Sequence, residues 1–287
     1  MSKLRSISRR VNSIRTLEGG GFPVRRPFPI QGQMQFDPFL LLDHFGPVEW
    51  EPGEAIGAPN HPHRGFQAVT YLLQGGNLHL DSHGGGGALG PGDVQWMTAG
   101  SGLIHSELPS DEILANGGVM EGFQLWVNLP QSHKLIPPEY QELKADKVPV
   151  HRFEKGLVKV IAGTAFGLTS PVKTVTPIGY LHLLLTPGGK AQLPVIEGHN
   201  AMIYLAHGQA RLGEALISEG EMVAFGQKGD WVELINPGLD ELSLLLLSGQ
   251  PLNEPIYRHG PFVMNSPEEI AQAFEDYRSG KMGRIGS

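Results

Sequence analysis

Two pairs of metal-ligating side chains stand two residues apart in this chain. The first pair is His61 and His63, and the second is His105 and Glu107. In an extended strand, residues i and i+2 point to the same face, so each pair can aim two groups at one point. Three imidazoles and one carboxylate suit a divalent transition metal, and octahedral coordination leaves two positions open for water, substrate or O2. The sequence therefore predicts a metal site with redox chemistry, provided that both strands line one small barrel.

Short strands separated by glycine and proline are the elements that must position these pairs. The chain of 287 residues contains 39 glycines and 23 prolines, which is typical of short strands joined by tight turns. Apolar residues make up 40% of it, enough for a well-buried core. Alternating or apolar runs predict strands at 39–42, 67–73, 78–81, 94–97, 103–107, 123–127, 158–162, 180–185, 202–205, 221–225, 231–235 and 242–247. Residues 46–60 and the glycine run 82–87 are expected to be loops, and 129–147 a connector.

Helical signals are clear only near the end of the chain. Ser266, Pro267 and Glu269 form a capping box with proline at the first helical position. Gly280 stands where such a helix should end. Apolar residues follow with helical spacing at Ile270, Ala273, Phe274 and Tyr277. We therefore expect an all-β chain with a short C-terminal helix.

The two halves of the chain echo each other. Residues 69–75 resemble 202–208, and residues 89–93 resemble 217–221. This internal repeat predicts two related barrels in tandem. We place the first barrel, with the metal site, in residues 1–135 and the second, which ends in the helix, in residues 136–287.

Ligand positions are not repeated in the second half. The repeat aligns the four candidate ligands with residues that are mostly unable to bind a metal: Pro194, Ile196, Glu233 and Ile235. We therefore expect one metal ion per chain, in the first barrel, and a second barrel without metal.

Composition excludes several classes of protein. There is no cysteine, so disulfides, thiolate metal sites and cysteine nucleophiles are absent. No apolar run is long enough for a membrane span. The net charge is −7, yet the first 30 residues carry seven basic side chains against one acidic. This arm could contact an acidic partner or resemble a transit peptide, but we favour strands with a basic solvent face. The acidic remainder argues against nucleic-acid binding.

Several longer strings resemble the pirin family. The strings that carry the resemblance are 37–40, 61–66, 92–107, 124–129 and 259–265, and it covers nearly the whole chain. Pirins are bicupins, so the resemblance implies two jelly-roll barrels. It also implies that His61, His63, His105 and Glu107 bind the metal, usually iron. The general cupin pattern has a glutamate four residues after the second histidine, where this chain has Gln67. Gln67 then either supports a ligand or a bound water, or faces solvent.

The resemblance also implies an activity. It points to a dioxygenase that opens a flavonol such as quercetin with O2, with Fe(II) as cofactor and Glu107 as the base. Ligand type leaves Mn, Ni, Cu and Zn open. Some pirins look like non-enzymatic, iron- and redox-dependent regulators of a transcription factor or metabolic enzyme. That alternative stays open, as does a structural metal.

The expected partners follow from this interpretation. We expect a small aromatic substrate and O2, and a protein partner only if the role is regulatory. Direct contact with nucleic acid or a membrane is not expected. We expect a monomer, because the second barrel can cover what a dimer partner otherwise would. The expected location is the cytoplasm, or also the nucleus if the source is eukaryotic.

Overall fold

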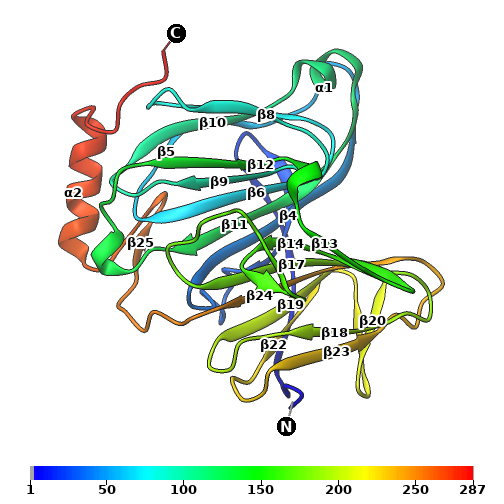
Figure 1. The fold of residues 1–287 in the computed structure, drawn as a ribbon. Coiled ribbons are helices and arrows are strands. Elements are labelled where there is room, and N and C mark those ends of the chain that lie inside the picture. The colour runs from blue at the N-terminus through cyan, green and yellow to red at the C-terminus, as the bar shows by residue number, and fades with distance from the viewer. Residues whose placement is uncertain (1–2, 287) are drawn as a thin grey trace. The chain divides into compact units, whose positions relative to one another are not determined.

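The chain folds into two compact units built almost entirely from β-strands (Figure 1). The computed structural model describes residues 3–286. The first barrel comprises residues 15–29, 39–145 and the segment from Leu252 onward. The second barrel comprises the chain up to Ile14, residues 30–38 and residues 146–251. Each is described by itself below.

The first barrel has a seven-stranded and a four-stranded sheet. Their strand orders are β12-β9-β6-β11-β4-β3-β2 and β5-β10-β7-β8. The strands are β2 (Ile14–Glu18), β3 (Phe22–Phe28), β4 (Phe39–Trp50), β5 (Ala58–His63), β6 (Phe66–Gln74), β7 (Asn77–Asp81), β8 (Gly86–Leu89), β9 (Val94–Thr98), β10 (Leu103–Pro109), β11 (Gly118–Asn128) and β12 (Glu139–Leu143). A further hairpin consists of β25 (Tyr257–His259) and β26 (Phe262–Met264).

The second barrel repeats this plan of seven and four strands. The orders are β1-β22-β19-β24-β17-β14-β13 and β18-β23-β20-β21. The strands are β1 (Ile7–Asn12), β13 (Val150–Phe153), β14 (Gly156–Ala162), β17 (Ile178–Leu185), β18 (Lys190–Pro194), β19 (Asn200–His207), β20 (Gln209–Leu212), β21 (Ala215–Ser218), β22 (Glu221–Phe225), β23 (Trp231–Ile235) and β24 (Leu242–Gly249), with a small hairpin of β15 (Thr164–Ala165) and β16 (Leu168–Thr169). The predicted all-β fold with two related barrels is confirmed.

The two barrels differ in what fills the space between their sheets. In the second barrel, buried side chains from both sheets form one aliphatic cluster, including Leu183, Ile203, Val223 and Leu234. One buried cluster of the first barrel includes Phe66 and Met97, and another includes Phe262 and Ile270. Burial of apolar surface therefore stabilises both barrels.

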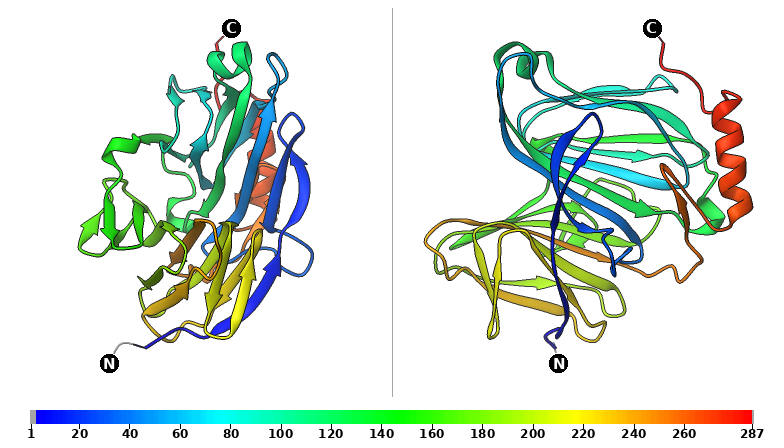
Figure 2. Two further views of the ribbon diagram at one scale, coloured as in Figure 1. Left: turned by 90° about the vertical axis from the view of Figure 1, so that its right-hand side faces the viewer. Right: turned by 180° about the vertical axis from the view of Figure 1, so that it is seen from behind.

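The units interleave in the sequence, which differs from the expected single boundary between residues 135 and 136. Strand β1 pairs with β22 and so belongs to the second barrel (Figure 2). Strand β12 pairs with β9 of the first barrel. The C-terminal segment also returns to the first barrel, where Phe262 and Arg64 form an isolated parallel β-bridge. Hydrogen bonding between strands far apart in the chain therefore decides which segments belong together.

Two α-helices lie within residues 3–286. The C-terminal helix α2 (Pro267–Arg278) begins as predicted, because Ser266 caps it by accepting from the Glu269 backbone N–H. The other, α1 (Asp111–Asn116), was not predicted; Ser110 caps it in the same way. Short 3₁₀ turns, η1 (Gln131–His133) and η2 (Ala145–Lys147), flank β12 in the segment expected to be a connector. Neither α-helix has the length and apolar character needed to cross a bilayer.

A buried lysine ties the C-terminal hairpin to the first barrel. The Lys134 ammonium donates to the carbonyl oxygens of Gly65 and Val263, at 2.7 and 2.9 Å, and to Oδ1 of Asn128 at 2.5 Å. Gly65 has a φ of +88°, and a Cβ there would lie 2.0 Å from the Val263 carbonyl oxygen. The hairpin thus packs directly on the chain beside His63.

We predict that Lys134→Met destabilises the protein. The change removes a charged donor from three oxygens and should lower the free energy of unfolding by about 2–4 kcal/mol. Denaturant unfolding monitored by tryptophan fluorescence measures this. The matched control is Lys147→Met, because the Lys147 side chain is 72% exposed and should matter little. Equal stability of both variants would contradict the role of Lys134.

A second prediction concerns acid stability. Lys281, together with hydrogen bonds from Arg64 and Gln272, holds the pKa of the Asp276 carboxyl at about 2, below its ordinary value of 3.8. The ionised carboxylate therefore stabilises the fold above about pH 4, and this contribution is lost as the pH falls toward about 2. We expect the stability difference between wild type and Asp276→Asn to be constant above pH 4 and to shrink below it.

Unfolding curves from pH 2 to 6 test this, with Asp146→Asn as the control. The Asp146 side chain is 71% exposed and pairs only with exposed Lys147. Its variant should follow wild type at every pH. A difference for Asp276→Asn that does not change between pH 2 and 6 would show that the carboxylate does not titrate with folding.

Candidate functional site

Strands β5 and β10 place three histidines on one inner wall of the first barrel. The two strands are antiparallel, with His61 directly opposite His105 and His63 opposite Leu103. Because side chains alternate along a strand, His63 lies on the same face as His61. The predicted strand geometry of the His61–His63 pair is therefore present.

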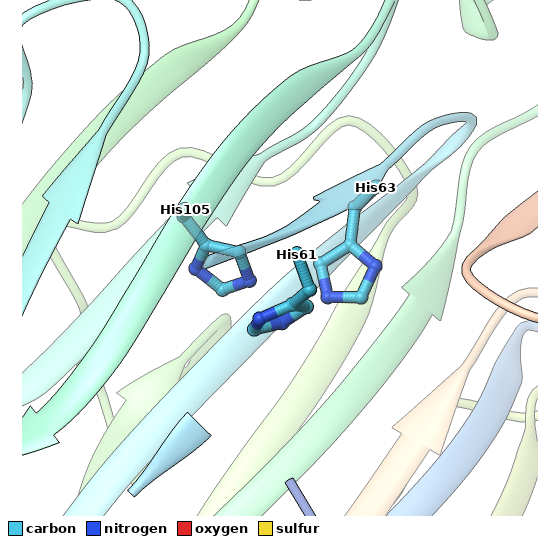
Figure 3. A group of neighbouring side chains, drawn as sticks. All are labelled: His61, His63 and His105. Carbon is cyan, nitrogen blue, oxygen red and sulfur yellow. The ribbon is translucent and has the colours of Figure 1, made fainter. Parts of the chain in front are cut away.

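The three imidazoles converge on one point (Figure 3). One ring nitrogen from each of His61, His63 and His105 lies within 4.8 Å of those of the others. Ring centroids are 4.2 Å apart for His61 and His105, 4.7 Å for His61 and His63, and 4.9 Å for His63 and His105. This spacing allows all three to ligate a single ion.

Hydrogen bonds at the other ring nitrogen orient each imidazole. Nδ1 of His61 lies 2.7 Å from the Pro59 carbonyl oxygen, and Nδ1 of His63 lies 3.4 Å from that of Pro261. A carbonyl oxygen only accepts, so it holds the proton on Nδ1 and leaves the Nε2 lone pair free. Nδ1 of His105 contacts another histidine, Nε2 of His79, at 2.8 Å.

Burial keeps two of these rings neutral. It holds the pKa of His63 well below 6.5, and the neighbouring His61 lowers it further. Burial also holds the pKa of His105 well below 6.5, with His63 and His61 adding to the effect. Metal ligation needs a deprotonated ring nitrogen, so the neutral state is the one that binds.

One observation shows that these residues fit a metal ion. Nε2 of His105 is fully buried and has no hydrogen-bond partner among the described residues. A buried polar atom of this kind costs free energy unless something satisfies it. A divalent ion between the three imidazoles would do so with a ligand type that it favours.

The comparisons with known proteins agree with the sequence motifs. The family model described as Pirin matches residues 21–127, and that of the pirin C-terminal cupin domain matches residues 180–283. Human pirin is 41% identical, over 99% of this chain and 96% of its own. Pirin-1 of Arabidopsis thaliana is 43% identical, over 93% and 90%.

The chain belongs to the pirin family. Among solved structures, quercetin 2,3-dioxygenase from Acinetobacter baumannii is similar, with a TM-score of 0.93 and 36% identity over 99% of this chain and all of that one. The expected jelly-roll bicupin fold is thereby confirmed.

Glu107 is placed apart from the three imidazoles of this pirin-family chain. A register shift between His105 and Glu107 breaks the regular pairing of β10 with β5. Such a bulge re-aims the side chain that follows it. The Glu107 carboxylate accepts from Oγ1 of Thr70 at 2.7 Å and from Nε2 of Gln124 at 2.9 Å. It faces the same cavity, and its ligation of a metal stays a prediction.

Gln67 does not have the solvent-facing position, because it is buried, and its support of a bound water stays a prediction. Its side-chain amide donates to Oγ1 of Thr98 at 2.8 Å. Its amide oxygen has no partner among the described residues. Gln67 therefore joins β6 to β9 and has no hydrogen bond to the three histidines.

His79 is the site residue whose role the sequence did not reveal. The sequence shows only that His79 and Asp81 share one face of a strand. In the structure His79 is buried, and it contacts both His105 and the Tyr140 hydroxyl. The pairing of β7 with β10 brings it there, and this pairing has no local signal in the sequence.

A cavity of about 480 Å³ opens beside the three histidines, within the first barrel. His61, His63 and Glu107 lie on its wall. Aromatic side chains line much of the rest: Phe22, Phe45, Trp50 and Trp126. The Trp126 ring stacks on Phe66 at 4.2 Å, and the Arg258 guanidinium lies 4.7 Å from it. A space of this size, lined by apolar side chains and by polar ones such as Asp43, Asn60 and Gln124, suits a small aromatic ligand that also carries polar groups.

Proposed function

We propose that this protein is a metal-dependent dioxygenase that acts on a flavonol-like substrate with O2. The observation that carries the proposal is the group of three converging imidazoles beside a cavity of about 480 Å³, with His61 and His63 on its wall. His61, His63 and His105 would hold one divalent ion per chain, and Glu107 would act beside it. The similar quercetin 2,3-dioxygenase of A. baumannii supports this class of reaction.

Each part of the cavity has a distinct task in this proposal. The aromatic wall around Trp126 would orient a flat substrate by stacking and exclude water from it. When bound, the metal would supply Lewis acidity toward the substrate hydroxyl and access to O2. Iron(II) is the ion that the family resemblance favours, and the ligand set also accepts nickel, copper, manganese or zinc.

Glu107 would be the base that takes the substrate proton. Thr70 and Gln124 each donate to one of its two oxygens, which fixes the carboxylate at the cavity wall. A carboxylate held in this way keeps unused lone pairs for a third donor. The substrate hydroxyl can supply that donor and then transfer its proton.

Metal content is the first prediction from this proposal. Protein loaded anaerobically with Fe(II) and then desalted should retain one iron per chain, as measured by elemental analysis. His105→Ala removes one of three ligands and should lose most of the metal. His133→Ala, at an exposed histidine on η1, is the matched control and should retain it. Two ions per chain, or full retention by His105→Ala, would contradict the site.

Oxygen uptake is the second prediction. Fe(II)-loaded protein should consume O2 on addition of quercetin and release carbon monoxide, and His105→Ala should not. Glu107→Gln should retain metal but lose turnover about 100-fold or more, because it cannot accept the proton. Absence of uptake by fully loaded wild type rejects the dioxygenase, and unchanged turnover of Glu107→Gln rejects Glu107 as the base.

A further inference from the structure

A chain of hydrogen bonds leads from the three histidines to the outer strand of the sheet. Nδ1 of His105 lies 2.8 Å from Nε2 of His79, and Nδ1 of His79 contacts the hydroxyl of Tyr140. His79 and His105 are both buried, with 1% of their surface exposed, whereas Tyr140, on β12, is half-buried. The chain therefore has one end at the cluster and the other near solvent.

His105 differs from the other two histidines in what fixes its proton. His61 and His63 face carbonyl oxygens, which only accept, so their protons stay on Nδ1. His105 faces an imidazole, which can either donate or accept. The tautomer of His105 is therefore decided by His79 and not by the backbone.

Only one direction of hydrogen-bond donation along this series leaves His105 able to bind a metal. If His79 donates from Nε2, neutral His105 carries its own proton on Nε2, where it blocks ligation. If His105 donates from Nδ1, its Nε2 lone pair is free. His79 then keeps its proton on Nδ1 and donates it to Tyr140.

We propose that His79 and Tyr140 are positioning residues that hold His105 in its metal-binding tautomer through a one-way chain from His105 to His79 to Tyr140. The inference rests on the metal site of the proposed function. Tyr140 suits the last place, because its hydroxyl can accept from His79 while its own proton turns away. Burial raises the pKa of Tyr140, so the phenol stays neutral and available to accept.

The affinity of matched variants for Ni²⁺ tests the hydrogen-bond series from His105 to Tyr140. Competition with a chromophoric chelator gives the Kd for Ni²⁺ of wild type, His79→Leu, His79→Gln and Tyr140→Phe, with His133→Leu as control. We expect His79→Leu to bind about 10–100-fold more weakly. His79→Gln should retain most of the affinity, because its amide oxygen can still accept from His105. Tyr140→Phe should fall between the two, and the control should match wild type.

Ring tautomers give a readout that packing alone would not move, and it needs no variant to fold. Nitrogen-15 NMR of the histidine side chains in Zn²⁺-loaded wild type should show both His105 and His79 protonated at Nδ1. The proposed hydrogen-bond direction is overturned, with the metal site left intact, if His79 is protonated at Nε2. The same holds if His79→Leu binds Ni²⁺ as tightly as wild type. Failure of wild type to bind either ion overturns the metal site and the chain together.

Discussion

The register between β5 and β10 is the constraint on which the site depends. His61 lies opposite His105 in this pairing, and His63 follows on the same face. A slip of one residue would turn these side chains to the other face of the sheet. The register is held from both sides, because β10 also pairs with β7 and because the C-terminal hairpin packs on Gly65, two residues beyond His63. Segments far apart in the sequence thus cooperate to aim three rings at one point.

Two barrels of one architecture use their interiors differently. The space between the sheets of the second barrel is filled with aliphatic side chains, which gives the large apolar burial that stabilises a domain. The first barrel also has a buried apolar core, but it contains a cavity with imidazoles on its wall. Specific polar contacts add to its stability, such as those of the buried Lys134 ammonium with its three acceptors. This division agrees with the absence of the histidine pairs from the second half of the internal repeat.

Local periodicity explains which parts of this structure the sequence could predict. Alternation predicted the strands, the capping box predicted the start of α2, and the i, i+2 spacing of His61 and His63 predicted two of the three histidines. The position of Glu107 could not be predicted, because a bulge after His105 depends on how β10 meets β5. Tyr140 lies in a proline-rich segment that has the composition of a connector, yet it forms a strand by pairing with β9. Long-range contacts also decide that β1 belongs to the second barrel and α2 to the first, and such contacts leave no local pattern in the sequence.

Three imidazoles whose ring nitrogens converge are an arrangement that folding alone does not favour. Their lone pairs point at one another, and the buried Nε2 of His105 has no partner among the described residues. An arrangement of this kind persists when the surrounding structure determines it, and it is typical of functional sites. Here carbonyl oxygens, a second histidine and a tyrosine fix the other side of each ring. The three rings are therefore oriented without an ion, so an ion that bound between them would not spend free energy on ordering them. The same rigidity makes the outer contacts of the rings as important to the site as the rings themselves.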